Sequence, residues 1–214
     1  MEIPGGPVTK TAFFCASLMA VLVLLFAGCA ANKQAIRPEY STVLNKWTKG
    51  RKIFKGLESR LYINATYKDP TFREAYIDRY AESYMLEESY RAALVERERE
   101  QAEKYNEFFM TAFTPVDRWN DFDKKDSVWK LYLEDSGGSR LSPVSITKVD
   151  ASDPLVREFF PYLDLWSSGY VVRFPKYSEA GREPIPGPDT EFIRLVITGV
   201  LGEGELTWPL KEEP

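Results

Sequence analysis

The stretch Arg60-Leu-Tyr-Ile-Asn-Ala-Thr-Tyr-Lys68 decides the fold class of this 214-residue chain. From Leu61 onward every second residue is apolar, which is the pattern of a β-strand with one buried face. The next residues, Asp69-Pro-Thr-Phe-Arg-Glu74, break the alternation, and Thr71 and Glu74 have the spacing of a helix capping box. We therefore predict a strand that is followed directly by a helix.

A helical pair is predicted over about residues 71–105. Aromatic residues recur every four positions along the first helix, and we expect them in the core; they are Phe72, Tyr76, Tyr80 and Tyr84. A bend near residues 85–89 opens the second helix, which runs to about Lys104. Between Glu96 and Lys104 only Ala102 is apolar. This second helix is therefore either a solvated helix or a projecting arm that meets a partner.

Six further short segments have the composition of strands. They are Phe108–Thr114, Val128–Glu134, Pro143–Val149, Tyr170–Phe174, Phe192–Thr198 and Glu205–Leu210. Residues 134–139 are predicted to form a hairpin loop, and residues 202–204 a tight turn. Because the strands do not alternate with helices, we predict a mainly β (α+β) domain over residues 57–212. Its architecture is a seven-stranded antiparallel β-sandwich, immunoglobulin-like in strand count only, with the helical pair inserted after the first strand.

The amino-terminal part of the chain passes abruptly from apolar to polar sequence. Residues 12–28 are apolar apart from Cys15 and Ser17, and they end in Phe26-Ala27-Gly28-Cys29. This tetrapeptide resembles the lipobox of bacterial lipoproteins. The resemblance implies that residues 1–28 are a signal peptide, that cleavage follows Gly28, and that Cys29 is acylated with fatty acid. The alternative is an uncleaved membrane anchor, and both alternatives put the body of the protein outside the cytoplasm.

The resemblance also implies a location and a tether. Ala30 and Ala31 follow the cysteine, without the aspartate that commonly retains such proteins at the inner membrane, so an outer-membrane location in the cell envelope is favoured. Residues 29–56 lack sustained periodicity, and we predict a flexible linker there that lets the body float clear of the bilayer. The partners expected are the membrane, through the lipid, and an envelope protein.

Five basic residues within the predicted linker form a candidate membrane-surface contact: Lys46, Lys49, Arg51, Lys52 and Lys55. Trp47 and Phe54 are interleaved with them. Each basic residue near an anionic surface contributes about 1 kcal/mol of binding free energy. The alternative is a solvated linker whose two aromatic residues pack on the body.

The absence of histidine from the chain excludes several kinds of chemistry. Ser-His and Cys-His nucleophilic pairs, and zinc or haem sites with histidine ligands, all need an imidazole. No phosphate-binding loop or Gly-x-Ser-x-Gly elbow occurs. The formal net charge of −4 argues against a nucleic-acid partner. We therefore expect no cofactor and no enzymatic activity.

One acidic cluster is a weak candidate for a calcium site. Asp121, Asp123 and Asp126 offer the oxygen ligands that calcium prefers. The cluster fails the EF-hand pattern, because Asp126 stands at the position of the turn glycine and Tyr132 at that of the bidentate glutamate. Turns stabilised by aspartate side chains are the alternative explanation.

Three functional hypotheses follow. The first is a non-enzymatic structural or adaptor module for another envelope protein. The second is a lipoprotein that binds a hydrophobic ligand or a glycan; outward residues such as Tyr62 and Tyr132 would form its apolar patch if they lie on one sheet face. The third and most distant is a cell-wall or polysaccharide hydrolase, which requires two carboxylates that face each other in a groove.

Overall fold

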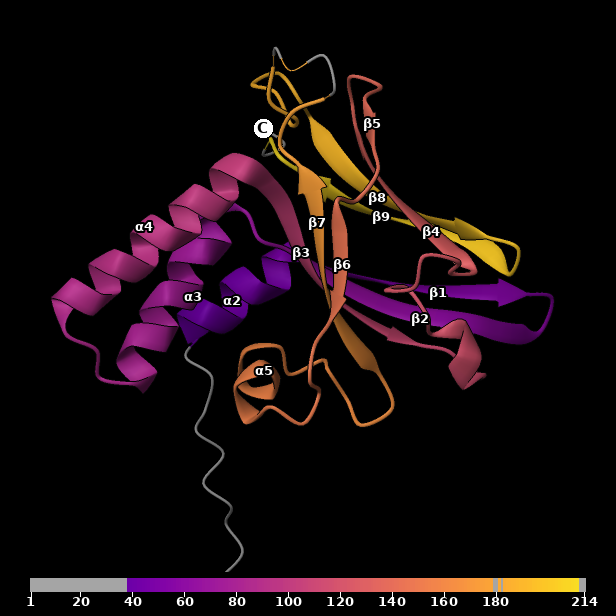
Figure 1. The fold of residues 1–214 in the computed structure, drawn as a ribbon, viewed down its shortest axis with the longest axis horizontal. Helices are drawn as coiled ribbons and strands as arrows, with labels where there is room; N and C mark the ends of the chain where they lie inside the picture. Colours follow the sequence, from indigo (N-terminus) through magenta and orange to yellow (C-terminus); the bar gives the residue numbers. More distant parts are fainter. Residues whose placement is uncertain (1–37, 179–180, 182, 212–214) are drawn as a thin grey trace, which may run out of the picture. The chain divides into compact units, whose positions relative to one another are not determined.

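The structure, a computed structural model, describes residues 38–178, 181 and 183–211. In this part of the chain nine strands form two sheets, and four α-helices lie beside them (Figure 1). The strands are β1 (Thr48–Lys55), β2 (Glu58–Tyr67), β3 (Tyr105–Phe113), β4 (Trp129–Asp135), β5 (Arg140–Leu141), β6 (Ser145–Lys148), β7 (Ser168–Pro175), β8 (Phe192–Gly199) and β9 (Gly202–Pro209). The helices are α2 (Pro38–Trp47), α3 (Pro70–Ser83), α4 (Glu88–Lys104) and α5 (Pro154–Phe159), and a short 3-10 helix, η2, covers Asp117–Trp119.

The two sheets pack face to face. Sheet A has the strand order β1-β2-β3-β7-β6, sheet B has the order β5-β4-β8-β9, and every pair is antiparallel. Their inner faces meet through large side chains: the rings of Phe108 in β3 and Trp208 in β9 lie 5.2 Å apart between centroids. The predicted mainly β sandwich with a helical insertion is confirmed. All seven predicted strands occur, together with β1 and β5, which the sequence analysis did not predict.

The prediction of a flexible linker is wrong for residues 38–55. These residues form α2 and β1, and they belong to the same compact unit as the sandwich. Tyr40, Leu44 and Trp47 are each buried in the core. The domain therefore begins well before residue 57, and the helical pair follows the second strand rather than the first. Residues 29–37 lie outside the described part of the chain.

Helix α3 begins two residues earlier than the capping-box spacing indicated. Its N-cap is Asp69, whose side chain accepts a hydrogen bond of 2.8 Å from the backbone N–H of Phe72, and Pro70 occupies the first turn. Thr71 is not the cap. Its hydroxyl donates to the Asp69 carboxylate and accepts from the indole N–H of Trp47. The helix start is thereby joined to the end of α2.

The aromatic stripe of α3 packs against the end of α5. Its spacing predicted that all four residues lie in the core, and this holds for all but the last. The ring of Tyr76 lies 4.5 Å from that of Phe159, and the ring of Phe72 lies 6.1 Å from that of Phe160. Tyr84, at the end of the stripe, is 52% exposed. Three turns of α3 therefore contribute to the core.

Helix α4 is a solvated helix with no buried residue. Arg99 forms ion pairs with Glu96 at 2.7 Å and with Glu103 at 3.0 Å along its exposed surface. Such pairs stabilise a helix by only a few tenths of a kcal/mol each, about 0.2–0.5. Whether α4 also meets a partner stays a prediction.

Buried charges fasten the helical pair to sheet A. The carboxylate of Glu107, in β3, accepts hydrogen bonds from the Lys68 ammonium at 2.5 Å and from the Arg173 guanidinium at 2.6 Å. Arg73 of α3 pairs with Glu98 of α4 at 2.5 Å. Burial alone would raise the pKa of Glu107, but the charge of Lys68, the hydrogen bonds from Lys68 and Arg173, and the charge of Arg73 lower this pKa to about 2. Glu107 is therefore ionised at any ordinary pH.

Of the two predicted turns, the one at residues 134–139 is found and the one at residues 202–204 lies elsewhere. Residues 134–139 form the predicted hairpin between β4 and β5, where Glu134 pairs with Arg140. The last hairpin turns at residues 200–201, between Gly199 and Gly202, so residues 202–204 already belong to β9. Gly202 has a φ of +148°, a conformation that side-chain-bearing residues rarely adopt.

Candidate functional site

A groove on the outer face of sheet A, away from sheet B, is the most distinctive surface of the described residues. Its cavity volume is about 620 Å³, which is within the usual size range of ligand sites. Strands β1 and β2 and the end of β3 form its floor, and the segment before β7 forms a wall. We call it the aromatic groove, and its principal residues are Gly50, Lys52, Tyr62, Asn64, Phe113 and Trp166.

Strand register builds the floor of the aromatic groove. Lys52 pairs with Tyr62, and Tyr62 pairs with Phe113, so the three side chains form one row across three strands. The rings of Tyr62 and Phe113 lie 5.8 Å apart between centroids, and the Lys52 ammonium lies 4.9 Å from the centroid of Tyr62. Phe54, 52% exposed, continues the aromatic surface at 6.2 Å from Tyr62. The floor thus combines flat apolar rings with a cation.

A short turn holds Trp166 at the wall of the groove. One carboxylate oxygen of Asp164 accepts hydrogen bonds from the backbone N–H groups of Trp166 at 2.9 Å and Ser167 at 2.8 Å. This is the Asx type of turn, which fixes the local backbone. Trp166 is 77% exposed. A tryptophan on a rigid turn with so much exposed surface contributes little to the core and is typical of a binding surface.

Asn64 gives the groove an unused polar group. Among the described residues, no hydrogen bond involves its side-chain amide, which retains donors and an acceptor for a ligand. Gly50 lies opposite Asn64 in the strand register, and a Cβ atom at Gly50 would lie only 2.6 Å from the Asn64 side-chain oxygen. Glycine at position 50 therefore makes room for the amide.

The five basic residues predicted to contact a membrane surface do not share one face. Lys46 ends α2, with its ammonium 5.7 Å from the ring of Trp47. Lys52 lies on the outer face of sheet A with Tyr62. Arg51 points to the opposite face of the strand, towards β9. A Cβ atom added to Gly204 of β9 would lie 3.3 Å from the Cγ of Arg51. Lys49 and Lys55 are the remaining basic residues of β1. The membrane contact stays a prediction, and Arg51 and Lys52 line the aromatic groove.

Tyr62 and Tyr132 do not form one patch, because they belong to different sheets. Tyr62 lies in β2 of sheet A, whereas Tyr132 lies in β4 of sheet B. The guanidinium carbon of Arg140 lies 4.2 Å from the centroid of the Tyr132 ring. The ring of Tyr62 lies instead next to those of Phe54 and Phe113, and Trp166 lines the same groove; the sequence analysis did not single out Phe113 or Trp166. The available signal for Trp166 was Asp164 two positions before it, since an aspartate there can form an Asx turn.

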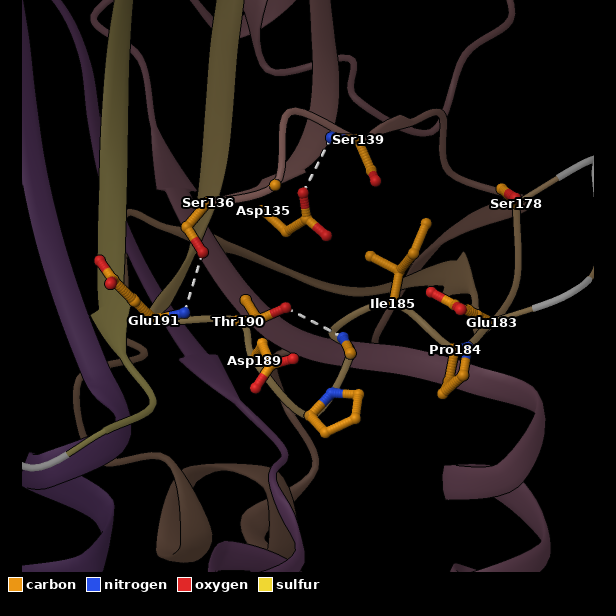
Figure 2. A pocket seen from close by; sticks show the side chains of 13 residues that line it. Asp135, Ser136, Ser139, Ser178, Glu183, Pro184, Ile185, Asp189, Thr190 and Glu191 are labelled. Carbon is orange, nitrogen blue, oxygen red and sulfur yellow. Dashed lines mark hydrogen bonds between the residues drawn. The ribbon is translucent and has the colours of Figure 1, made fainter.

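A second cavity of the described residues is acidic (Figure 2), with a volume of about 710 Å³. It lies beside the β4–β5 hairpin and the segment before β8, and its carboxylates are those of Asp135, Glu183, Asp189 and Glu191. The carboxylate of Asp135 accepts a hydrogen bond of 2.8 Å from the backbone N–H of Ser139, and the side chain of Ile185 separates it from Glu183 in this view. The hydrolase hypothesis, which requires two carboxylates that face each other in a groove, stays a prediction.

The calcium candidate does not form a metal site. The carboxylate of Asp121 accepts hydrogen bonds from the Ser127 hydroxyl at 2.8 Å and from the backbone N–H of Val128 at 3.3 Å. It thereby closes the loop before β4, which is the structural alternative given above. Asp123 and Asp126 are exposed. In the described ranges no group of three or more acidic residues could hold a metal ion.

The turn between α3 and α4 carries a second exposed apolar surface, the hairpin tip. It consists of Tyr84, Met85 and Tyr90, which are 52%, 90% and 65% exposed. Met85 has a φ of +47°, in the left-handed region that side chains seldom adopt. The tip is thus a sharply turned segment that presents large side chains to solvent.

The predicted lipidation and cleavage sites are not part of the described structure. Gly28 and Cys29 lie outside the described residues, so the cleavage and acylation stay predictions. Helices long and apolar enough to cross a membrane are absent from the described part of the chain.

Comparisons with known proteins give a distant likeness to one solved structure. No family model matches the chain, and no curated protein matches it. Among solved structures, a crystal structure of a novel protein of unknown function from Burkholderia pseudomallei is similar over 83% of this chain and 86% of that chain. The sequence identity is 10% and the TM-score is 0.39, so this likeness carries no argument about the site or the function.

Proposed function

We propose that this protein is a lipid-anchored, non-enzymatic binding module of the bacterial cell envelope. In this proposal the acyl chains on Cys29 hold the domain at the membrane, and the aromatic groove holds a component of the envelope. The observation that supports binding most directly is the groove itself, where Tyr62, Phe113 and Trp166 surround a recess that opens to solvent. The complete absence of histidine supports the non-enzymatic part.

The short distance between anchor and body supports a role close to the membrane. Only eight residues, 30–37, separate Cys29 from the first residue of α2. A fully extended chain advances about 3.3–3.6 Å per residue, so eight residues reach roughly 30 Å at most. In this proposal the domain therefore stays within roughly 30 Å of its point of attachment to the bilayer.

Site-specific photocrosslinking in the native host tests the binding module. A photoreactive phenylalanine analogue at position 62 should capture an envelope component. The matched control carries the analogue at position 132, an aromatic position of comparable burial in sheet B. Equal capture from positions 62 and 132, or none from position 62, would contradict the proposal.

A second candidate function is an adaptor for an envelope protein, and the hairpin tip favours it. Tyr84, Met85 and Tyr90 project from the turn between α3 and α4 and present the kind of side chains that protein interfaces prefer. The photoreactive analogue at position 85 would then capture a protein. Absence of a crosslinked protein at position 85 would leave the groove as the only candidate surface.

A further inference from the structure

We propose that the aromatic groove binds an anionic glycan, a chain of pyranose sugars that carry carboxylate groups. This inference rests on the proposed function as a binding module, and it names the class of ligand. Three features of the groove lead to it: the arrangement of aromatic rings, the unused amide of Asn64, and the excess of positive charge on β1.

The aromatic rings suit the faces of sugar rings. A pyranose ring has C–H groups on its two faces, which pack well on the flat surface of an aromatic side chain, while its hydroxyl groups point outward at the edge. Tyr62 and Phe113 lie side by side on the floor, and the Asx turn at Asp164 holds Trp166 at the wall. Because a turn and a sheet fix these rings before binding, little conformational entropy is lost on association.

The amide of Asn64 suits sugar hydroxyl groups. It has two N–H donors and a carbonyl acceptor, and none of them is used among the described residues. Adjacent hydroxyl groups on a sugar can each donate and accept, so one amide can bind a pair of them. Gly50 keeps this amide accessible, since a Cβ there would collide with its oxygen.

The charge of the groove suits a carboxylate. Strand β1 carries four basic residues and no acidic one, in a chain whose formal net charge is −4. The ammonium of Lys52 lies over the ring of Tyr62, 4.9 Å from its centroid, where it would meet the carboxylate of a sugar bound in the groove. The only acidic residue of the groove lining, Asp164, already accepts two backbone hydrogen bonds. A sugar carboxylate at this position would therefore meet Lys52 with little opposing charge.

Two other anionic partners fit the groove less well. A flat bilayer surface reaches projecting side chains, whereas Tyr62 and Phe113 lie half-buried on the floor of a recess. An acidic peptide that binds as an added strand needs unpaired backbone groups. Strand β1 is an edge of sheet A, but the floor is the face of β1, β2 and β3, and the backbone groups between these strands are paired in the sheet.

The test uses the processed, acylated protein in micelles of an uncharged detergent. Hexagalacturonate is the charged probe, and its methyl ester is the matched probe, which keeps the sugar rings and loses the carboxylate charge. We expect hexagalacturonate to bind by calorimetry, the ester to bind about tenfold more weakly, and added salt to reduce this difference. Trp166→Ala should weaken the binding of both probes about tenfold. Lys52→Gln should remove the difference between the two probes.

The control variants keep the experiment specific. Tyr177→Ala removes an exposed aromatic ring after β7, and Lys130→Gln removes an exposed cation on β4, and neither should change binding. Trp166 and Lys52 are exposed, so their variants should keep the wild-type circular dichroism spectrum. The inference is overturned if hexagalacturonate does not bind, or if Trp166→Ala and Lys52→Gln bind it as the wild type does.

Further measurements separate the glycan from the other partners. Polyglutamate that binds as tightly as hexagalacturonate, and depends equally on Trp166, would indicate an acidic peptide and overturn the inference. Quenching of Trp166 fluorescence by brominated phosphatidylglycerol in nanodiscs, detected by comparison with Trp166→Ala, would indicate membrane docking and also overturn it. The proposed function has a separate readout, because acylation of Cys29 and crosslinking at position 62 can succeed even if hexagalacturonate does not bind.

Discussion

The indole N–H of Trp208 donates a hydrogen bond of 2.6 Å to the backbone carbonyl of Trp47. This bond joins the last strand of sheet B to the end of α2, and both residues are buried. A segment with the composition of a linker is therefore built into the core. Loss of the contacts that α2 makes in the core should therefore lower the stability of the whole domain.

Leu44 and Asn45 provide a matched test of that conclusion. Leu44 is 3% exposed and packs in the core, whereas its neighbour Asn45 is exposed. Leu44→Ala should lower the free energy of unfolding by about 2–5 kcal/mol, because it leaves a cavity. Asn45→Ala should change it by less than about 0.5 kcal/mol. Urea denaturation followed by tryptophan fluorescence measures both, and equal effects would mean that α2 is not part of the core.

Asp69 and Glu74 distinguish the observed helix cap from the one indicated by the sequence spacing. Asp69→Ala removes the acceptor of the Phe72 N–H and should cost about 1 kcal/mol of unfolding free energy. Glu74 would matter equally in a capping box, but it is exposed and the cap lies at Asp69. Glu74→Ala should therefore cost less than about 0.5 kcal/mol. Thermal unfolding by circular dichroism compares the two, and a larger loss for Glu74→Ala would support the capping box.

Glu107 should make the free energy of unfolding of the domain depend on pH in the acidic range. Its pKa in the folded protein is about 2, below the ordinary value of 4.5, so its ionised form stabilises the folded state above pH 4.5. This contribution is lost as the pH falls from about 4.5 towards 2. Glu107→Gln leaves Lys68 and Arg173 without their shared carboxylate, and it should cost about 3 kcal/mol at neutral pH.

The quantity to measure is the difference in the free energy of unfolding between Glu107→Gln and the wild type. It should shrink as the pH is lowered through that window in urea denaturation experiments. Glu96→Gln, which breaks an exposed pair with Arg99 on α4, is the control and should change the free energy of unfolding far less than Glu107→Gln does. A difference that is constant from neutral pH to pH 2 would show that Glu107 does not stabilise the fold through its charge.

The two cysteines give a matched test of the lipid anchor. Cys29→Ser should abolish metabolic labelling with fatty acid and leave the precursor unprocessed, because the acylated sulfur is lost. Cys15→Ser lies within the predicted signal peptide and should keep both labelling and processing. Fluorography and intact-mass measurement of the purified protein detect the two outcomes. Labelling that persists in Cys29→Ser would remove the anchor from the proposal.

The sequence predicts the sandwich well where one strand face is buried. In β2 the alternation from Leu61 to Tyr67 matches the buried pleat, and only Thr66 departs from it because Tyr162 covers it. Strand β1 has a single buried residue, Ile53, and the rest of the strand is charged, exposed or half-buried, so no alternation of period two is visible. Helix α2 did have a signal, since Tyr40, Leu44 and Trp47 recur at helical spacing. These three positions are too few to show a sustained period, so the segment was predicted to be a linker.

The candidate site could be predicted only in part. Alternation indicated that Tyr62 points away from the core, and this is correct. Its neighbours depend on which strands pair, and Phe113 and Trp166 lie about 50 and 100 positions further along the chain. Local patterns carry no information on such long-range pairing, which is why Tyr132 was chosen as the neighbour. The orientation of Trp166 depends in addition on two hydrogen bonds to one carboxylate oxygen.

The short outer strands of the two sheets have a consequence for a protein that is crowded on a surface. Strands β5 and β6, at one edge of each sheet, have only two and four residues. A long, flat edge would offer unpaired backbone groups to a neighbouring copy and promote aggregation. The edge strand β1 is longer, but its four positive charges repel the same strand of another copy. In the proposed lipid-anchored protein, neighbouring copies would therefore not join their sheets through β1, β5 or β6.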